Sequence, residues 1–186
     1  DYKTMDIDFM ESVWWVFKKL WDKGLIYEGV KVVPYSWRVS TPLSNFEANL
    51  NYKDIQDPSV TLRFKVKGED NLYFLAWTTT PWTLPSNMGL CAGPKLCYCK
   101  IRDKKSGDAY ILTKSRISTY FEEGSYEVLT EMQGTELHRM TYEPLFDFAK
   151  SHVDTTNTWA VQLDDYVNDD SGTGIVHLAC FGEDDV

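Results

Sequence analysis

Near the N-terminus, apolar residues recur every three or four positions, which is the spacing of an amphipathic helix. The repeat is carried by Met10, Val13, Trp14, Phe17, Leu20 and Trp21. Asp6 or Asp8 can cap the first turn, and Gly24 is placed to end the helix. The apolar face is large for a terminal helix, so we expect it to pack on another part of the protein. Leu25–Tyr35 is then expected to be extended and to close at Pro34.

After this helix the pattern changes to short strands. Residues 36–58 are rich in Ser, Thr, Pro, Asn and Asp, and we expect a linker with little regular structure. Alternating apolar and polar residues over 60–67 predict a half-buried strand, and Gly68–Asn71 is expected to form a turn. Leu72–Trp77 is a continuous apolar run, which favours a strand buried on both faces. Further strands are expected at Met88–Cys91, Leu96–Ile101, Ala109–Leu112, Tyr126–Met132, Trp159–Leu163 and Gly174–Ala179.

These elements predict an α+β fold that is mainly β. Short helices are expected at Lys114–Phe121 and Tyr142–Ala149. Many short strands with few helices favour a closed or nearly closed β-barrel with helical decoration. We expect residues 1–45 to form a helix and a connecting segment, and residues 46–186 to form the β domain.

Composition and charge narrow the possible functions. The 186 residues are 43% hydrophobic and 15% aromatic, which suits one globular domain with a flanking piece. The net charge of −9 argues against a domain whose main task is to grip a phosphate backbone. Any nucleic-acid contact is therefore expected to be local and weak, or to be helped by another part of a larger protein. Basic residues do gather between positions 100 and 116, where a solvated hairpin with a following helix face is the simpler interpretation.

The cysteines give no sign of a metal site. There are four, Cys91, Cys97, Cys99 and Cys180; none forms a C-x-x-C pair, and the three histidines lie far from Cys97 and Cys99 in sequence. We expect no metal or other cofactor, and reduced thiols as in a cytoplasmic protein. No apolar run approaches the roughly 18 residues of a membrane span, so no membrane partner is expected. The chain begins without an initiator Met and is interpreted as an excerpt of a longer protein.

Two segments carry residues suited to chemistry. The loop after the apolar strand contains Thr78, Thr79, Thr80 and Thr83, whose hydroxyls donate or accept hydrogen bonds, and two prolines that stiffen it. Composition alone also fits an ordinary surface turn. The second segment is Gly172–Asp185, where a histidine interrupts an apolar strand and an acidic trio follows. Here a satisfied core histidine and a solvated helix start are the simpler alternatives to a catalyst and to a carboxylate that holds a cation.

Several enzyme classes are excluded by the sequence. The Gly-x-Ser-x-Gly motif of serine hydrolases is absent. The glycine-rich phosphate loops Gly-x-Gly-x-x-Gly and Gly-x-x-x-x-Gly-Lys are also absent, so no nucleotide-phosphate loop is encoded.

Taken together, the two segments resemble the editing motifs of isoleucyl-tRNA synthetases. Trp77-Thr-Thr-Thr-Pro-Trp-Thr-Leu-Pro-Ser-Asn87 is similar to the threonine-rich editing peptide of that family. Gly172-Thr-Gly-Ile-Val-His177 is similar to the second editing motif, which continues to a glycine and an acidic cluster. Valyl and leucyl relatives usually have Arg at the position of Thr80 and an acidic residue at that of Trp82. Thr80-Pro81-Trp82 therefore resembles the isoleucyl branch. Resemblance to the eukaryotic cytosolic type extends over Val13–Gly29, Val33–Asn49 and Tyr142–Phe148.

The chain departs from the family pattern near Cys180. The family generally has a proline there and one more residue before Phe181. Aligning back from Phe181-Gly182 makes Asp185 the aspartate that binds the substrate amine, with Asp184 as the alternative. The family's editing insert also continues past this aspartate, whereas this chain ends at Val186.

The resemblance implies a proofreading hydrolase built on a β-barrel editing (CP1) domain. Its expected substrate is valine esterified to the 3′ end of tRNA(Ile), with valyl-adenylate as a further substrate, and its other partner is the rest of the synthetase in the same chain. Thr78, Thr79, Thr80 and Asp185 are the expected catalytic residues. Thr83 and His177 are expected to form a steric wall against isoleucine, and Trp82 to contact substrate or support the loop. A barrel that binds without hydrolysis, and a purely structural barrel, are the competing hypotheses.

Overall fold

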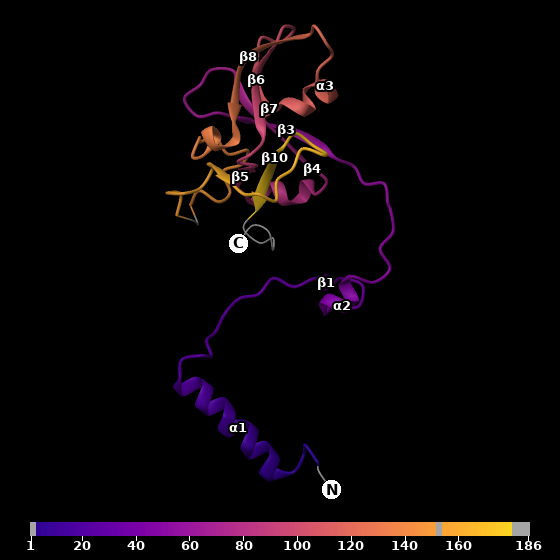
Figure 1. The fold of residues 1–186 in the computed structure, drawn as a ribbon, viewed down its shortest axis with the longest axis vertical. Helices are drawn as coiled ribbons and strands as arrows, with labels where there is room; N and C mark the ends of the chain where they lie inside the picture. The colour runs from indigo at the N-terminus through magenta and orange to yellow at the C-terminus, as the bar shows by residue number, and fades with distance from the viewer. Residues whose placement is uncertain (1–2, 152–153, 180–186) are drawn as a thin grey trace. The chain divides into compact units, whose positions relative to one another are not determined.

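The structure is a computed structural model that describes residues 3–151 and 154–179 (Figure 1). Its contacts divide the chain into two compact units, Asp1–Asn49 and Leu50–Val186. Within the described ranges, none of the helices combines the length and the apolar character needed for a membrane span.

The first unit contains the expected amphipathic helix. Helix α1 spans Ile7–Asp22, begins after Asp6 and ends where Gly24 adopts a positive φ of 67°. None of its residues is buried, and Trp14 and Trp21 are 67% and 58% exposed. Its large apolar face is therefore open in this unit, and the packing partner expected from the residue pattern stays a prediction.

The segment predicted to be a linker holds more structure than expected. Strands β1 (Tyr35–Ser36) and β2 (Thr41–Pro42) pair antiparallel, and helix α2 covers Asn45–Ala48. A capping box begins α2, because the Ser44 side chain accepts the Glu47 N–H while the Glu47 carboxylate accepts the Ser44 N–H. The Ser-x-x-Glu spacing could have predicted this turn of helix.

The second unit contains a five-stranded sheet in the order β3-β4-β7-β6-β8. All neighbours in it are antiparallel except β4 and β7, which are parallel. The apolar run predicted to be buried on both faces forms the inner strand β4, as expected. The bounds are β3 Val60–Lys65, β4 Leu72–Thr78, β6 Cys97–Asp103, β7 Ala109–Thr113 and β8 Tyr126–Gln133.

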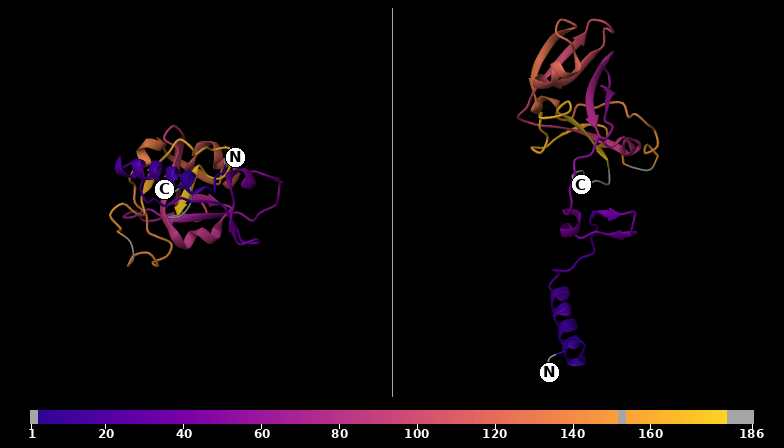
Figure 2. Two further views of the ribbon diagram at one scale, coloured as in Figure 1. Left: turned by 90° about the horizontal axis from the view of Figure 1, so that it is seen from below. Right: turned by 90° about the vertical axis from the view of Figure 1, so that its right-hand side faces the viewer.

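A three-stranded sheet carries the second glycine-rich segment. Its order is β10-β5-β9, with β5 (Asn87–Ala92) antiparallel to β10 (Ile175–Ala179) and parallel to β9 (Val161–Leu163). Strand β10 lies beside β4 without pairing with it, so the two sheets meet at this point (Figures 1 and 2). One apolar core spans both sheets and includes Phe64, Phe74, Leu90, Tyr98, Leu137, Tyr142, Val161 and Ile175.

The structure corrects the predicted barrel and one predicted helix of this unit. The described strands form two open, mixed sheets, so the predicted closed barrel is not found among them. The helix predicted at Tyr142–Ala149 is also wrong. Tyr142 donates its backbone N–H to Trp159 O at 2.9 Å, and Glu143 donates to Lys65 O at 2.8 Å, so this backbone bonds to residues distant in the sequence instead of to its own next turn. Pro144 further disfavours a helical conformation at Glu143.

Short helices connect the strands. The helix predicted at Lys114–Phe121 is present as the 3₁₀ turn η2 (Lys114–Arg116) followed by α3 (Ile117–Tyr120). Two further 3₁₀ helices are η1 (Pro81–Ser86) and η3 (Gly134–Leu137). Element η1 follows β4 and contains Thr83 and both prolines of the threonine-rich segment, where a loop is predicted from the sequence.

Candidate functional site

The threonine-rich segment is held in shape by its own hydroxyls. Thr78 ends β4 and is only 7% exposed. Its Oγ1 accepts the backbone N–H of Thr80 at 3.0 Å and lies 3.1 Å from the Thr80 hydroxyl. Pro81 then begins η1, where its missing N–H leaves no backbone donor unsatisfied. Thr78 and Thr80 therefore fix the turn from strand to helix.

Thr83 connects this segment to the second motif. Its hydroxyl donates to Thr80 O at 2.7 Å and lies 2.7 Å from Nε2 of His177. Because a threonine hydroxyl has one proton, and that proton points to the carbonyl, the imidazole must be the donor in the second contact. His177 therefore carries a proton on Nε2. The hydrogen bonds join Thr78, Thr80, Thr83 and His177, which we call the Thr–His cluster.

The exposure of these side chains separates their possible roles. Thr79 and Trp82 are exposed, Trp82 by 73%, while Thr80 and Thr83 are half-buried. His177 is 8% exposed. A ligand could thus reach Thr79, Thr80 and Trp82 most easily, whereas Thr78 and His177 support the surface from below.

Asn87 is a structural part of the threonine-rich motif that the residue pattern did not single out. Its amide Nδ2 donates to Gly89 O at 2.8 Å and to Leu178 O at 3.4 Å. Its Oδ1 accepts the hydroxyl of the buried Tyr142 at 2.6 Å. The side chain therefore ties the start of β5 to β10 where the ladder between Leu178 and Ala179 shifts register. In the sequence, the available signal was an asparagine directly before an apolar strand.

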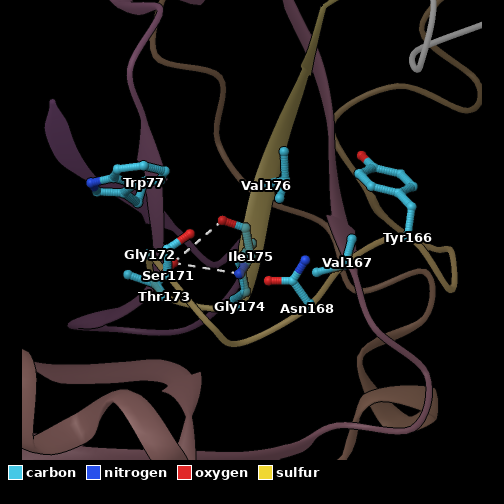
Figure 3. A pocket seen from close by; sticks show the side chains of 10 residues that line it. All are labelled: Trp77, Tyr166, Val167, Asn168, Ser171, Gly172, Thr173, Gly174, Ile175 and Val176. Carbon is cyan, nitrogen blue, oxygen red and sulfur yellow. Dashed lines mark hydrogen bonds between the residues drawn. The ribbon is translucent and has the colours of Figure 1, made fainter. Parts of the chain in front are cut away.

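The two glycines of the second motif allow close packing. Gly172 has a φ of +65°, and a Cβ there would lie 3.0 Å from Trp77. Gly174 has a φ of +72°, and a Cβ there would lie 2.1 Å from Thr113 Cγ2. Both backbone conformation and space therefore require glycine at Gly174. Thr173 between them is buried, and its hydroxyl bonds to the backbone of Ile175 (Figure 3).

A small cavity of about 200 Å³ lies beside these glycines. Trp77 and Tyr166 stand on opposite sides of it in Figure 3. Asn168, Ser171 and the segment Gly172–Val176 complete much of the lining. The cavity and the Thr–His cluster both depend on β4 and β10, but none of the four cluster residues lines the cavity.

The acidic residues expected to bind the substrate amine lie outside the described residues. This applies to Asp184 and Asp185, and also to Cys180, where the chain departs from the family pattern. Their assignment stays a prediction.

Three of the six basic residues between positions 100 and 116 bond to other groups of the protein. Lys114 pairs with Glu131 at 2.6 Å, and Lys104 donates to Gly124 O at 2.9 Å. Arg116 Nε donates to Gly172 O at 3.0 Å. The expected hairpin is formed by β6 and β7. These contacts favour a solvated structural face over a free phosphate-binding patch.

The described cysteines are free thiols. Cys97 and Cys99 both lie on β6, as their spacing predicted, and Cys91 lies on β5. Burial raises the pKa of Cys99 to about 11. Among the described residues, no group of three or more His, Cys, Asp and Glu side chains could hold a metal ion.

Comparison with known proteins relates the chain to tRNA synthetases. Residues 1–173 match the family model for tRNA synthetases class I (I, L, M and V). The chain is 52% identical over 187 residues to isoleucine--tRNA ligase, cytoplasmic, of Mus musculus, covering 100% of this chain and 15% of that protein. It is 48% identical over 217 residues to the Arabidopsis thaliana protein of the same name, covering 100% and 18%. The chain thus spans less than a fifth of the length of these relatives.

A solved structure resembles the fold. The crystal structure of GlLeuRS-CP1 matches with a TM-score of 0.52 and 16% sequence identity, covering 65% of this chain and 54% of that chain. At this identity the match shows likeness of fold.

Proposed function

The chain belongs to the class I tRNA synthetases (I, L, M and V), and on this basis we propose that it hydrolyses valine wrongly esterified to tRNA(Ile). The hydrogen bond between Thr83 and His177 carries the proposal, because it joins the two segments that resemble editing motifs. The similarity to isoleucine--tRNA ligases over the whole chain supports the choice of tRNA(Ile).

Selectivity would follow the double-sieve logic, which is already established for this class of enzyme. Valine lacks one methylene of isoleucine, and a synthetic pocket gains only about 1–3 kcal/mol from that group. A second, smaller site can admit valine and exclude isoleucine by steric overlap. Thr83 and His177 are the proposed wall of that site, since their side chains contact each other and are held by the turn below them.

Hydrolysis of this substrate needs no covalent intermediate on the protein. A water oxygen attacks the carbonyl carbon of the ester, the bond to the ribose oxygen breaks, and that oxygen takes a proton. The products are valine and the free 3′ end of the tRNA. Hydroxyls of Thr79 and Thr80 would orient the water or stabilise the developing oxyanion. Thr78 would act through its bonds to Thr80, because its own hydroxyl is buried.

The α-amino group of the substrate supplies a second handle. It is protonated at neutral pH, and a carboxylate can bind it through a charge-assisted hydrogen bond of roughly 1.5–3 kcal/mol. We assign this role to Asp185, with Asp184 as the alternative. Trp82 would contact the substrate or support η1.

The proposal extends to the setting of the domain. Residues 1–45 would join it to the body of the synthetase, and residues 46–186 would form the editing domain. The tRNA would be held mainly by that body, in the cytoplasm, where the names of the mouse and plant relatives place those proteins. Valyl-adenylate is also an activated acyl group and would be a further substrate.

A deacylation assay separates this function from binding alone. The chain should release valine from Val-tRNA(Ile) faster than buffer does, and Asp185→Ala should remove the acceleration. Binding of the charged 3′ end without any release of valine would instead support a binding module.

A further inference from the structure

Three consecutive carbonyls of the Gly172-Thr173-Gly174 turn accept hydrogen bonds from the five-stranded sheet and the turn that follows it. Gly172 O accepts Arg116 Nε–H at 3.0 Å. Thr173 O accepts the backbone N–H of Thr113 at 3.0 Å and its hydroxyl at 3.2 Å. Gly174 O accepts the Tyr98 hydroxyl at 2.5 Å. The donors come from β6, the end of β7 and η2, so three different elements hold one turn.

Tyr98 differs from the other donors because its hydroxyl also accepts a hydrogen bond. Its side chain is fully buried, and its hydroxyl also accepts the backbone N–H of Gly93 at 2.9 Å. Gly93 follows β5 directly, and Gly174 precedes β10. Ala92 and Ile175 are the end pair of the ladder between these two strands. The Tyr98 hydroxyl therefore bridges the next two backbone groups beyond the ladder, from a strand that belongs to the other sheet.

We propose that Tyr98 is a positioning residue, whose hydroxyl sets where β10 begins against β5 and so holds His177 against Thr83. His177 lies three residues after Gly174 on a short strand, so a shift of the turn is carried along β10 to the imidazole. Thr113 and Arg116 act in the same way on the two preceding carbonyls. For hydrolysis, this inference rests on the proposed function.

The test compares Tyr98→Phe with Tyr110→Phe. Both changes remove one phenolic hydroxyl from the five-stranded sheet. The Tyr110 hydroxyl, however, contacts Arg63 and Asp108 on the opposite face of that sheet. The first readout is the ¹H–¹⁵N spectrum of the His177 ring, which reports the proton on Nε2. The second is kcat/KM for deacylation of Val-tRNA(Ile) and of Ile-tRNA(Ile). Circular dichroism and thermal melting check the fold.

In Tyr98→Phe we expect the His177 Nε2 signal to shift and the preference for Val-tRNA(Ile) over Ile-tRNA(Ile) to fall about tenfold, since one methylene in a pocket is worth about 10- to 200-fold and a displaced wall loses part of that. The rate for Ile-tRNA(Ile) should change more than the rate for Val-tRNA(Ile), because the change acts on His177 and not on the hydroxyls that orient the water. Tyr110→Phe should leave the His177 signal and this preference unchanged. An unchanged His177 signal in folded Tyr98→Phe overturns the proposal, whatever the rates.

The design separates this inference from the proposed function. If the unmodified chain releases no valine, the proposed function fails, and the His177 spectrum alone decides whether Tyr98 positions that ring. If Tyr98→Phe does not fold, Arg116→Lys provides the test. It keeps the charge at a half-buried site but removes the Nε–H donor to Gly172 O. A His177 signal that does not move in Arg116→Lys then overturns the proposal that these donors position β10.

Discussion

The Thr83 hydroxyl lies 2.7 Å from His177 Nε2 and accepts a hydrogen bond from its N–H, so the two side chains are in direct contact. If this pair is the wall against isoleucine, trimming either side chain should open it. We expect Thr83→Ala and His177→Ala to hydrolyse correctly charged Ile-tRNA(Ile), measured as release of labelled isoleucine. If both variants spare Ile-tRNA(Ile), selectivity lies elsewhere in the site.

Two conservative variants of Thr83 separate shape from hydrogen bonding. Thr83→Ser keeps the hydroxyl that contacts Thr80 and His177 but removes the methyl group. Thr83→Val keeps the volume but leaves the buried His177 donor without this acceptor, at a cost of about 1–3 kcal/mol. A steric wall predicts that the Ser variant leaks isoleucine more than the Val variant at the same temperature. The reverse order would show that the hydrogen bond, which orients His177, sets the selectivity.

The assignment of the amine-binding carboxylate rests on an alignment through a shortened segment. Asp185→Ala should abolish hydrolysis of Val-tRNA(Ile) while its circular dichroism and melting temperature stay close to those of the unmodified chain. Asp185→Asn is the matched control for charge, because it keeps the size and loses the anion. Full activity in Asp185→Ala together with inactivity in Asp184→Ala would move the role by one residue.

The acidic charge of the chain predicts weak binding of tRNA. A net charge of −9 opposes the approach of a polyanion, and Lys104, Lys114 and Arg116 are already engaged by other groups. We expect a Kd for tRNA(Ile) above roughly 10 μM at physiological salt, where specific nucleic-acid binders commonly reach ~10⁻⁸ M. A short mimic of the charged 3′ end should bind about as well as whole charged tRNA. A hundredfold preference for whole tRNA would identify the basic residues of β6, β7 and η2 as a docking surface.

Stability should fall at alkaline pH. Burial raises the pKa of Cys99 to about 11. Burial also raises the pKa of Tyr142, and this outweighs the lowering effect of its hydrogen bond with Asn87. In the unfolded chain these protons leave near the ordinary values of about 8.5 and about 10. The unfolded state then binds fewer protons than the native state, so the free energy of unfolding decreases with rising pH.

Urea unfolding between about pH 8 and 11 measures this effect. The contribution of Cys99 should be complete below about pH 8.5 and lost as the pH approaches 11. Cys99→Ala should therefore lose less stability over this range than the unmodified chain, while Cys97→Ala on the same strand serves as the control. Equal pH dependence in all three proteins would refute the role of Cys99.

The sequence predicted the elements whose residue pattern is local and missed those whose partners are distant in the chain. The alternation from Val60 and the apolar run Leu72–Trp77 identified β3 and β4, because burial of one or both faces is written directly in such patterns. The 3₁₀ helix η1 was missed because two prolines and several threonines usually indicate an irregular loop. The false helix at Tyr142–Ala149 arose because its backbone partners, Lys65 and Trp159, are distant in sequence.

The site itself shows the same limit. Residue types drew attention to the threonines and to His177, but only the resemblance to a family brought both segments into one site. Their contact depends on β10 lying beside β4, which no local pattern encodes. Tyr98 gave no signal at all, since its hydroxyl acts on a turn formed by distant residues.

The relative rates of deacylation of Val-tRNA(Ile) and Ile-tRNA(Ile) test the central claim most directly. Both substrates share the same tRNA and differ by one methylene, so tRNA binding cancels in the comparison. We expect the chain to hydrolyse Val-tRNA(Ile) roughly a hundredfold faster than Ile-tRNA(Ile), and faster than spontaneous hydrolysis in buffer. Equal rates for the two substrates, or a Val-tRNA(Ile) rate no higher than that in buffer, would contradict the account.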